Sequence, residues 1–137
     1  MNNGGRADMD DKETRCNKAN ELVKLIATKG RKFCNYEDRT DRNGHISYFK
    51  LINNRVYYVD GFTHKAIYAY HYRHFKRYFS EGGTLQALMQ DLSLYIRTGM
   101  PTNGTNGYGG VYCQAWGYPE DDLAEIRTKA VEIGFSL

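Results

Sequence analysis

Residues 45–60 read His-Ile-Ser-Tyr-Phe-Lys-Leu-Ile-Asn-Asn-Arg-Val-Tyr-Tyr-Val-Asp. On either side of the Asn53-Asn54 pair, apolar and aromatic residues alternate with polar ones, which is the period of a half-buried strand. Asparagine tolerates positive φ, so the pair suits the two-residue loop of a tight hairpin. The sequence therefore predicts two antiparallel strands, at 45–52 and 55–60.

Two further strands are predicted around this hairpin. One covers 32–38 and joins it through the turn Arg42-Asn43-Gly44, and the other covers 65–72. In the later strand, Tyr68, Tyr70 and Tyr72 would share one face because side chains alternate across a strand. The four strands together predict an antiparallel meander.

Three segments show apolar residues at helical spacing, each with end signals of its own. The first covers 10–29. The second starts at Thr84 as its N-cap and ends at Gly99, and the third opens on Pro119 with acidic residues in its first turn. The residues expected to face the core are Ala19, Leu22, Val23, Ile26, Leu85, Leu88, Met89, Leu92, Tyr95, Ile96, Leu123, Ile126, Ala130 and Ile133.

The order of these elements predicts a single α+β domain. Residues 1–9 are expected to be a mobile polar leader and 10–137 the domain, a four-stranded antiparallel meander with helices packed on one face, in the order α-β-β-β-β-α-α. Residues 73–81, between the last strand and the second helix, fit either a helix with an apolar stripe at Phe75, Tyr78 and Phe79 or an extension of the strand, and an irregular connection is the favoured interpretation. A chain of 137 residues that is 41% hydrophobic can bury one core.

Charge is distributed unevenly along the chain. Residues 1–80 hold 16 Lys/Arg and 9 Asp/Glu, a balance of +7, whereas residues 81–137 hold 3 and 7, a balance of −4; the two sum to the net +3. All four histidines also lie in the basic half. Such asymmetry predicts an anionic partner for one end of the molecule.

The three cysteines, Cys16, Cys34 and Cys113, are odd in number and far apart, and no apolar run is long enough to span a bilayer. The sequence shows no signal peptide. We therefore expect a cytoplasmic protein with reduced thiols and no membrane partner.

The segment 67–79 interleaves aromatic rings with cationic or titratable side chains almost residue by residue. Rings can stack on bases while guanidinium and ammonium groups pair with phosphates. We therefore expect a non-enzymatic binding module that engages nucleic acid or a host nucleoprotein complex; the competing interpretation is an ordinary solvated face. The candidate residues are Tyr68, Tyr70, His71, Tyr72, Arg73, His74, Lys76 and Arg77, with Arg55 and Lys65 from the neighbouring strands.

Residues 99–118 contain six glycines together with large aromatic residues. Tyrosine and tryptophan are the residues that most often anchor protein interfaces. The alternative hypothesis is a protein–protein inhibitor that acts through this loop. Its candidate anchors are Tyr108, Tyr112, Trp116 and Tyr118.

Catalytic and cofactor interpretations rest on weaker patterns. His71-x-x-His74 with His64 lacks an evident third metal ligand, Cys113 has no local nucleophile signature, and the glycine-rich run 103–110 lacks the Lys-Ser/Thr ending of a phosphate-binding loop. A small hydrolase or metal enzyme is thus the least favoured alternative. No cofactor or metal is expected. The element order resembles that of double-stranded-RNA-binding domains, but the closing helix starts without the basic cluster of that family.

Three pieces of the chain resemble small uncharacterised proteins of bacteriophages and other mobile elements. They are Phe79-Ser80-Glu81-Gly82-Gly83-Thr84-Leu85, Tyr95-Ile96-Arg97-Thr98-Gly99 and Trp116-Gly117-Tyr118. The resemblance implies a phage or plasmid accessory protein that acts in the cytoplasm of the host. Inhibitors of host defence, including anti-CRISPR proteins, are one class of such proteins.

Overall fold

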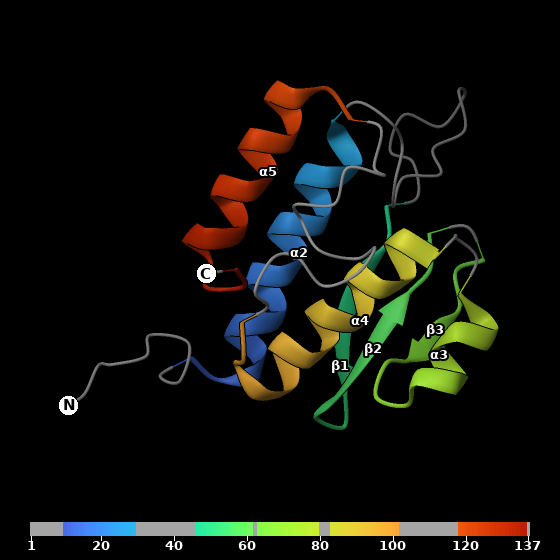
Figure 1. Cartoon of the computed structure of the whole chain (residues 1–137). Coiled ribbons are helices and arrows are strands. Elements are labelled where there is room, and N and C mark those ends of the chain that lie inside the picture. The colour runs from blue at the N-terminus through green and yellow to red at the C-terminus, as the bar shows by residue number, and fades with distance from the viewer. Residues whose placement is uncertain (1–9, 30–45, 62, 80–82, 102–117, 137) are drawn as a thin grey trace.

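The computed structural model describes residues 10–29, 46–61, 63–79, 83–101 and 118–136. Within them the protein is α+β, with four helices and a three-stranded antiparallel sheet (Figure 1). The elements are α2 (Lys12–Thr28), β1 (Tyr48–Ile52), β2 (Arg55–Val59), β3 (Ala66–Tyr68), α3 (Tyr72–Tyr78), α4 (Gly83–Thr98) and α5 (Glu120–Glu132).

The hairpin prediction is confirmed. Asn53 and Asn54 adopt φ of 52° and 64°, so they form the tight connection between β1 and β2. The register pairs Phe49 with Tyr58, and Tyr58 with Ile67 on β3. These three side chains are buried and face one side of the sheet, so their sequence neighbours face the other side.

The sheet can be compared with the predicted meander over its last three strands, and it differs in the last of them. The strand predicted at 32–38 lies outside the described residues, so the sheet that the structure describes has three strands. The strand predicted at 65–72 is too long, because β3 ends at Tyr68. Tyr72 therefore does not share a strand face with Tyr68; it begins α3 instead.

The irregular connection predicted for 73–81 is wrong over the residues that the structure describes. Residues 72–78 form α3 because a helix places Phe75 and Phe79 on the same side. Phe75 is fully buried, and its ring lies 5.6 Å from that of Tyr58, while the Phe79 ring lies 5.3 Å from Tyr58. Burial of these two rings against the sheet thus determines the local structure.

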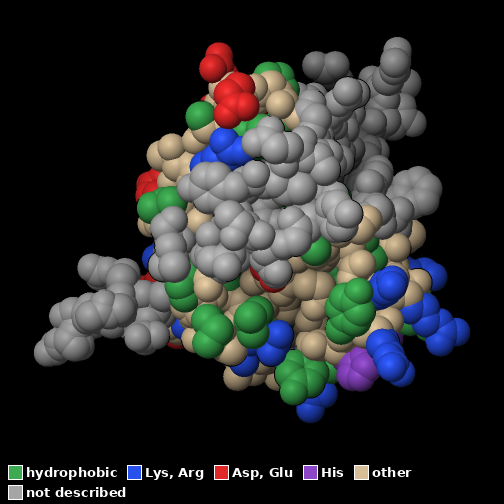
Figure 2. All heavy atoms as spheres, in the orientation of Figure 1, with side chains coloured by type: hydrophobic (Ala, Val, Ile, Leu, Met, Phe, Trp, Pro, Cys, Tyr) green, Lys and Arg blue, Asp and Glu red, His purple; other side chains and the backbone are tan. Residues whose placement is uncertain are grey.

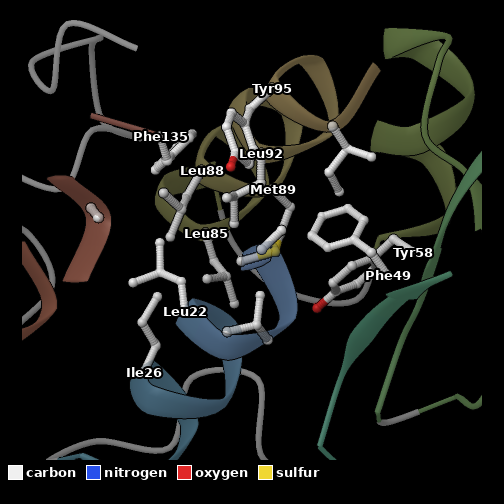
Figure 3. Packing of buried hydrophobic residues seen from close by; sticks show 14 of the residues in the cluster. Leu22, Ile26, Phe49, Tyr58, Leu85, Leu88, Met89, Leu92, Tyr95 and Phe135 are labelled. Carbon is white, nitrogen blue, oxygen red and sulfur yellow. The ribbon is translucent and has the colours of Figure 1, made fainter. Parts of the chain in front are cut away.

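The helices form the rest of the core. α2 and α4 contact each other and cover the inner face of the sheet, while α5 packs along α2 and α3 lies beside β3 (Figure 1). All fourteen residues predicted to face the core are buried. Figure 3 shows Phe49 and Tyr58 on the sheet side of this cluster and Leu22 and Leu88 between the helices on its other side, with Met89 between the two groups.

The helix ends follow the predictions closely. α2 is capped by the Asp11 carboxylate, which accepts from the Thr14 N–H at 2.8 Å, and Pro119 precedes α5. Gly99, at φ 79°, ends α4. One boundary is wrong: α4 already includes Gly83, so Thr84 lies inside the helix and is not its N-cap.

Burial of the Cys16 thiol, with a smaller contribution from the Glu13 carboxylate, raises its pKa to about 11. The unfolded chain then loses the thiol proton at lower pH than the folded chain does. This difference contributes about 2–3 kcal/mol to the free energy of unfolding below about pH 9, and the contribution is lost between pH 9 and 11. We expect urea unfolding midpoints to fall more steeply over this range than those of Cys16→Ala. Equal slopes in the two proteins would contradict this assignment.

Candidate functional site

The outer face of the sheet carries a row of tyrosine rings. Tyr57 and Tyr68 are cross-strand partners on β2 and β3, with ring centroids 5.2 Å apart. The Tyr70 ring continues the row, stacked at 6.0 Å from Tyr68, and Tyr70 is 58% exposed. Three rings from two strands and the segment after them therefore form one aromatic surface on the side of the sheet away from the core.

Two guanidinium groups lie on these rings. Arg55 of β2 is 6.0 Å from the Tyr68 centroid, and Arg97, in the last turn of α4, is 4.8 Å from the Tyr70 centroid. Lys50 pairs with Tyr57 across β1 and β2 and is exposed. The aromatic row thus has cations at several points along it.

Helix α3 carries the second half of the site. Its buried Phe75 fixes the helix against the sheet, so the other residues of the helix point to solvent. Lys76 lies 5.9 Å from the centroid of the Tyr72 ring, and Arg77 lies 5.5 Å from that of Tyr78. Figure 2 shows Lys and Arg side chains gathering with a histidine over α3 at the lower right.

A groove of about 220 Å³ separates α3 from β3. It is lined by Lys65, Ala66 and Ile67 from the strand side and by His74 and Tyr78 from the helix. The His74 and Tyr78 rings are 4.9 Å apart at an interplanar angle of 51°. We call the outer sheet face and the exposed face of α3 the basic-aromatic surface; its members are Lys50, Arg55, Tyr57, Lys65, Tyr68, Tyr70, Tyr72, Arg73, His74, Lys76, Arg77, Tyr78 and Arg97.

A cluster of acidic residues lies away from this surface, at the start of α5. Glu120, Asp121 and Asp122 occupy the first turn of α5, where they complement the helix dipole. Acidic side chains appear at the top of Figure 2, over α5 and away from α3. The acidic first turn of α5 therefore lies apart from the cations of α3.

The structure brings together most of the residues predicted for the site. Arg55 and Tyr68 lie on the sheet, and Tyr70 lies in the segment that follows β3. Lys65 lines the groove, and Tyr72, Arg73, His74, Lys76 and Arg77 lie on α3. His71 is the residue before α3 and is exposed; its side chain makes no capping hydrogen bond. Four members of the surface were not among the candidate residues: Lys50, Tyr57, Tyr78 and Arg97.

One predicted anchor of the 99–118 loop, Tyr118, has a structural role in the core. Tyr118 is buried, and its hydroxyl donates to the Ile26 carbonyl at 2.9 Å. It therefore holds the entry to α5 against α2 and is not an exposed interface anchor. The other predicted anchors of this loop, Tyr108, Tyr112 and Trp116, lie outside the described residues.

Within the described ranges, no three His, Cys, Asp or Glu side chains lie close enough together to hold a metal ion. In the same ranges, no helix is both long enough and apolar enough to cross a lipid bilayer.

Comparison with known proteins places the chain in a family. The model of the YoqU family matches residues 10–136. The SPbeta prophage-derived uncharacterized protein YoqU of Bacillus subtilis (strain 168) is 32% identical over 122 residues, which cover 88% of this chain and 82% of that protein. No solved structure matches the chain. The resemblance to phage proteins is thus confirmed by a prophage-derived relative, and the chain belongs to the YoqU family.

Proposed function

We propose that the protein is an accessory protein of a phage or related mobile element that binds nucleic acid through the basic-aromatic surface. The observation that supports this most is the row formed by Tyr57, Tyr68 and Tyr70 with Arg55 and Arg97 on its rings. Bases stack on aromatic side chains and on guanidinium planes. The prophage origin of the relative supports the accessory role.

The distribution of ion pairs argues against an ordinary solvated face. On the side of α2 and α5, cations pair with carboxylates, as Lys18 does with Asp10 and Lys129 with Glu21. Among the described residues, by contrast, Arg73, Lys76 and Arg77 form no ion pair with a carboxylate. Because no carboxylate of the described residues pairs with these three cations, the structure supports their being available to phosphates.

The experiment that tests the proposal is a salt titration. Fluorescently labelled single- and double-stranded RNA and DNA are titrated with the protein at about 50, 100 and 200 mM salt. We expect a micromolar or tighter Kd at the lowest salt and a steep, linear fall of log K with log salt, because each phosphate that is neutralised releases counterions. Absence of binding to all four probes at 50 mM salt would overturn the proposal.

An inhibitor of host defence, of the anti-CRISPR kind, stays as the alternative and would act on a protein partner. It predicts that the protein captures a host protein while binding none of the four probes. The two functions therefore give opposite results in the same titration.

A further inference from the structure

We propose that the groove between β3 and α3 holds one unpaired nucleobase, so that the protein selects single-stranded nucleic acid over a duplex. This inference rests on the proposed function and specifies its ligand. Three observations support it: the volume of the groove, the residues that line it, and its position between cations.

The size of the groove suits a single flat ring system. Its volume of about 220 Å³ is below the roughly 300–1,000 Å³ typical of sites for drug-sized ligands. A base that is stacked and paired in a duplex hides both of its faces, so only an unpaired or extruded base can enter such a groove.

The lining offers the contacts that a base needs. The Tyr78 and His74 rings stand on the helix side, and Tyr78 is 45% exposed, so part of the ring is available for stacking. On the strand side, the Lys65 carbonyl accepts from the Asp60 N–H and the Ala69 N–H donates to the Val56 carbonyl. In an antiparallel ladder this alternation turns the N–H and C=O of Ala66 away from β2. Ala66 can therefore offer one donor and one acceptor to the edge of a base.

Cations lie on both sides of the groove. Lys65 stands at the strand side, while Arg77 lies 5.5 Å from the centroid of the Tyr78 ring on the helix side. A strand whose base enters the groove can therefore place its flanking phosphates next to these groups. Tyr68 of the same strand belongs to the tyrosine row of the outer sheet face, and this row can receive a neighbouring base.

The test separates bases from phosphates. The full chain is titrated with a dodecamer of thymidines and with an abasic dodecamer that has the same number of phosphates, and in a second arm with oligouridine of the same length. Stacking contributes roughly 1–3 kcal/mol per base, so we expect the abasic strand to bind about 5- to 150-fold more weakly. A duplex of the same length is expected to bind more weakly than the thymidine strand at equal salt.

Three variants locate the base. Tyr78→Ala is expected to weaken binding of the thymidine strand without changing its salt slope or the binding of the abasic strand. Tyr78→Phe keeps the ring and should retain wild-type affinity. Tyr48→Ala is the matched control, because Tyr48 is also an exposed ring but lies on β1, at the far side of β2 from the groove.

The outcomes distinguish this inference from the proposed function. Salt-dependent binding with equal affinity for thymidine, abasic and duplex probes would leave the proposed function standing and overturn the groove. A further variant, Tyr68→Ala, tests the sheet face. If the preference for bases survives Tyr78→Ala but disappears in Tyr68→Ala, the base lies on the sheet, so the groove is overturned and the proposed function stands. Absence of binding to every probe would overturn both proposals.

Discussion

Changing Arg73, Lys76 and Arg77 together to glutamine is expected to weaken nucleic-acid binding about 100-fold at 0.1 M salt. Each phosphate contact on a single strand contributes about 0.7 to the slope of log K against log salt, so three contacts contribute about 2. With 1 M salt as the reference at which the two proteins bind equally, a difference of 2 in slope makes their affinities differ about 100-fold at 0.1 M salt. The measurement is the Kd of a labelled strand at several salt concentrations.

The triple change is expected to leave the fold intact. All three side chains are exposed, whereas α3 is held to the sheet by the buried Phe75. Glutamine is also about as good a helix former as lysine or arginine. Thermal unfolding should therefore give a midpoint close to that of the wild type, and a loss of binding would reflect the loss of charge at this place.

A matched control separates local contacts from net charge. Changing Lys24, Arg127 and Lys129 to glutamine lowers the net charge by the same amount, but on the side of α2 and α5. Surface ion pairs contribute about 0–1 kcal/mol, so breaking the pairs of Arg127 and Lys129 should leave the protein folded. If this control weakened binding as much as the α3 variant does, a diffuse field would explain the affinity and α3 would not be the contact.

Local patterns predicted the parts of the fold that depend on local chemistry. Asn53 and Asn54 form the hairpin because two adjacent residues that tolerate positive φ suit the two-residue turn between antiparallel strands. The spacing of Leu85, Leu88 and Leu92 predicts the buried face of α4 for the same kind of reason. Neither prediction requires knowledge of a distant residue.

The parts that were missed depend on contacts between distant residues. Residues 72–78 fit a strand or a helix equally well by pattern, and the burial of Phe75 against Tyr58 selects the helix. Tyr118 was predicted to be an interface anchor, but it is buried, and its hydroxyl donates to a carbonyl of α2. Tertiary packing decides both cases, and no local pattern reveals it.

The candidate site was predicted in its composition but not in its full membership. The density of rings and cations in 67–79 indicated the segment that forms the end of β3 and α3, although the helix itself was not predicted. Arg97 was missed because it belongs to α4 in sequence and reaches Tyr70 only through the packing of that helix. The sequence contains one hint of its role: Arg97 is the single Lys or Arg between Arg77 and Arg127.

Changing Arg15 to methionine is expected to lower the free energy of unfolding by about 3 kcal/mol. Arg15 is 8% exposed, and its Nε donates to the Ile96 carbonyl at 2.9 Å. Its guanidinium also donates to the carbonyls of Arg97, at 3.4 Å, and Asp10. The last carbonyls of a helix lack partners within it, so Arg15 acts as a side-chain cap for α4. Hydrogen bonds to charged groups contribute about 1.5–3 kcal/mol each, and methionine replaces none of them.

Urea unfolding followed by circular dichroism measures this loss, with two variants as references. Arg15→Lys keeps the charge, but its single ammonium lacks the planar fork that reaches several carbonyls, so we expect it to recover only part of the stability. Lys18→Met removes a neighbouring cation of α2 whose ion pair with Asp10 is partly exposed, and it should cost less than about 1 kcal/mol. Equal losses in Arg15→Met and Lys18→Met would show that the capping of α4 contributes little.

The same variant connects stability to the candidate site. The carbonyls that Arg15 caps belong to Ile96 and Arg97, and the Arg97 side chain lies on the Tyr70 ring. If the last turn of α4 frays when its cap is lost, the guanidinium leaves the tyrosine row. We therefore expect Arg15→Met, at a temperature where it is still folded, to bind the thymidine strand more weakly than the wild type. The slope of log K against log salt should fall by less than the roughly 0.7 that one phosphate contact contributes. Wild-type affinity in the folded variant would show that Arg97 does not need this cap to remain on the ring.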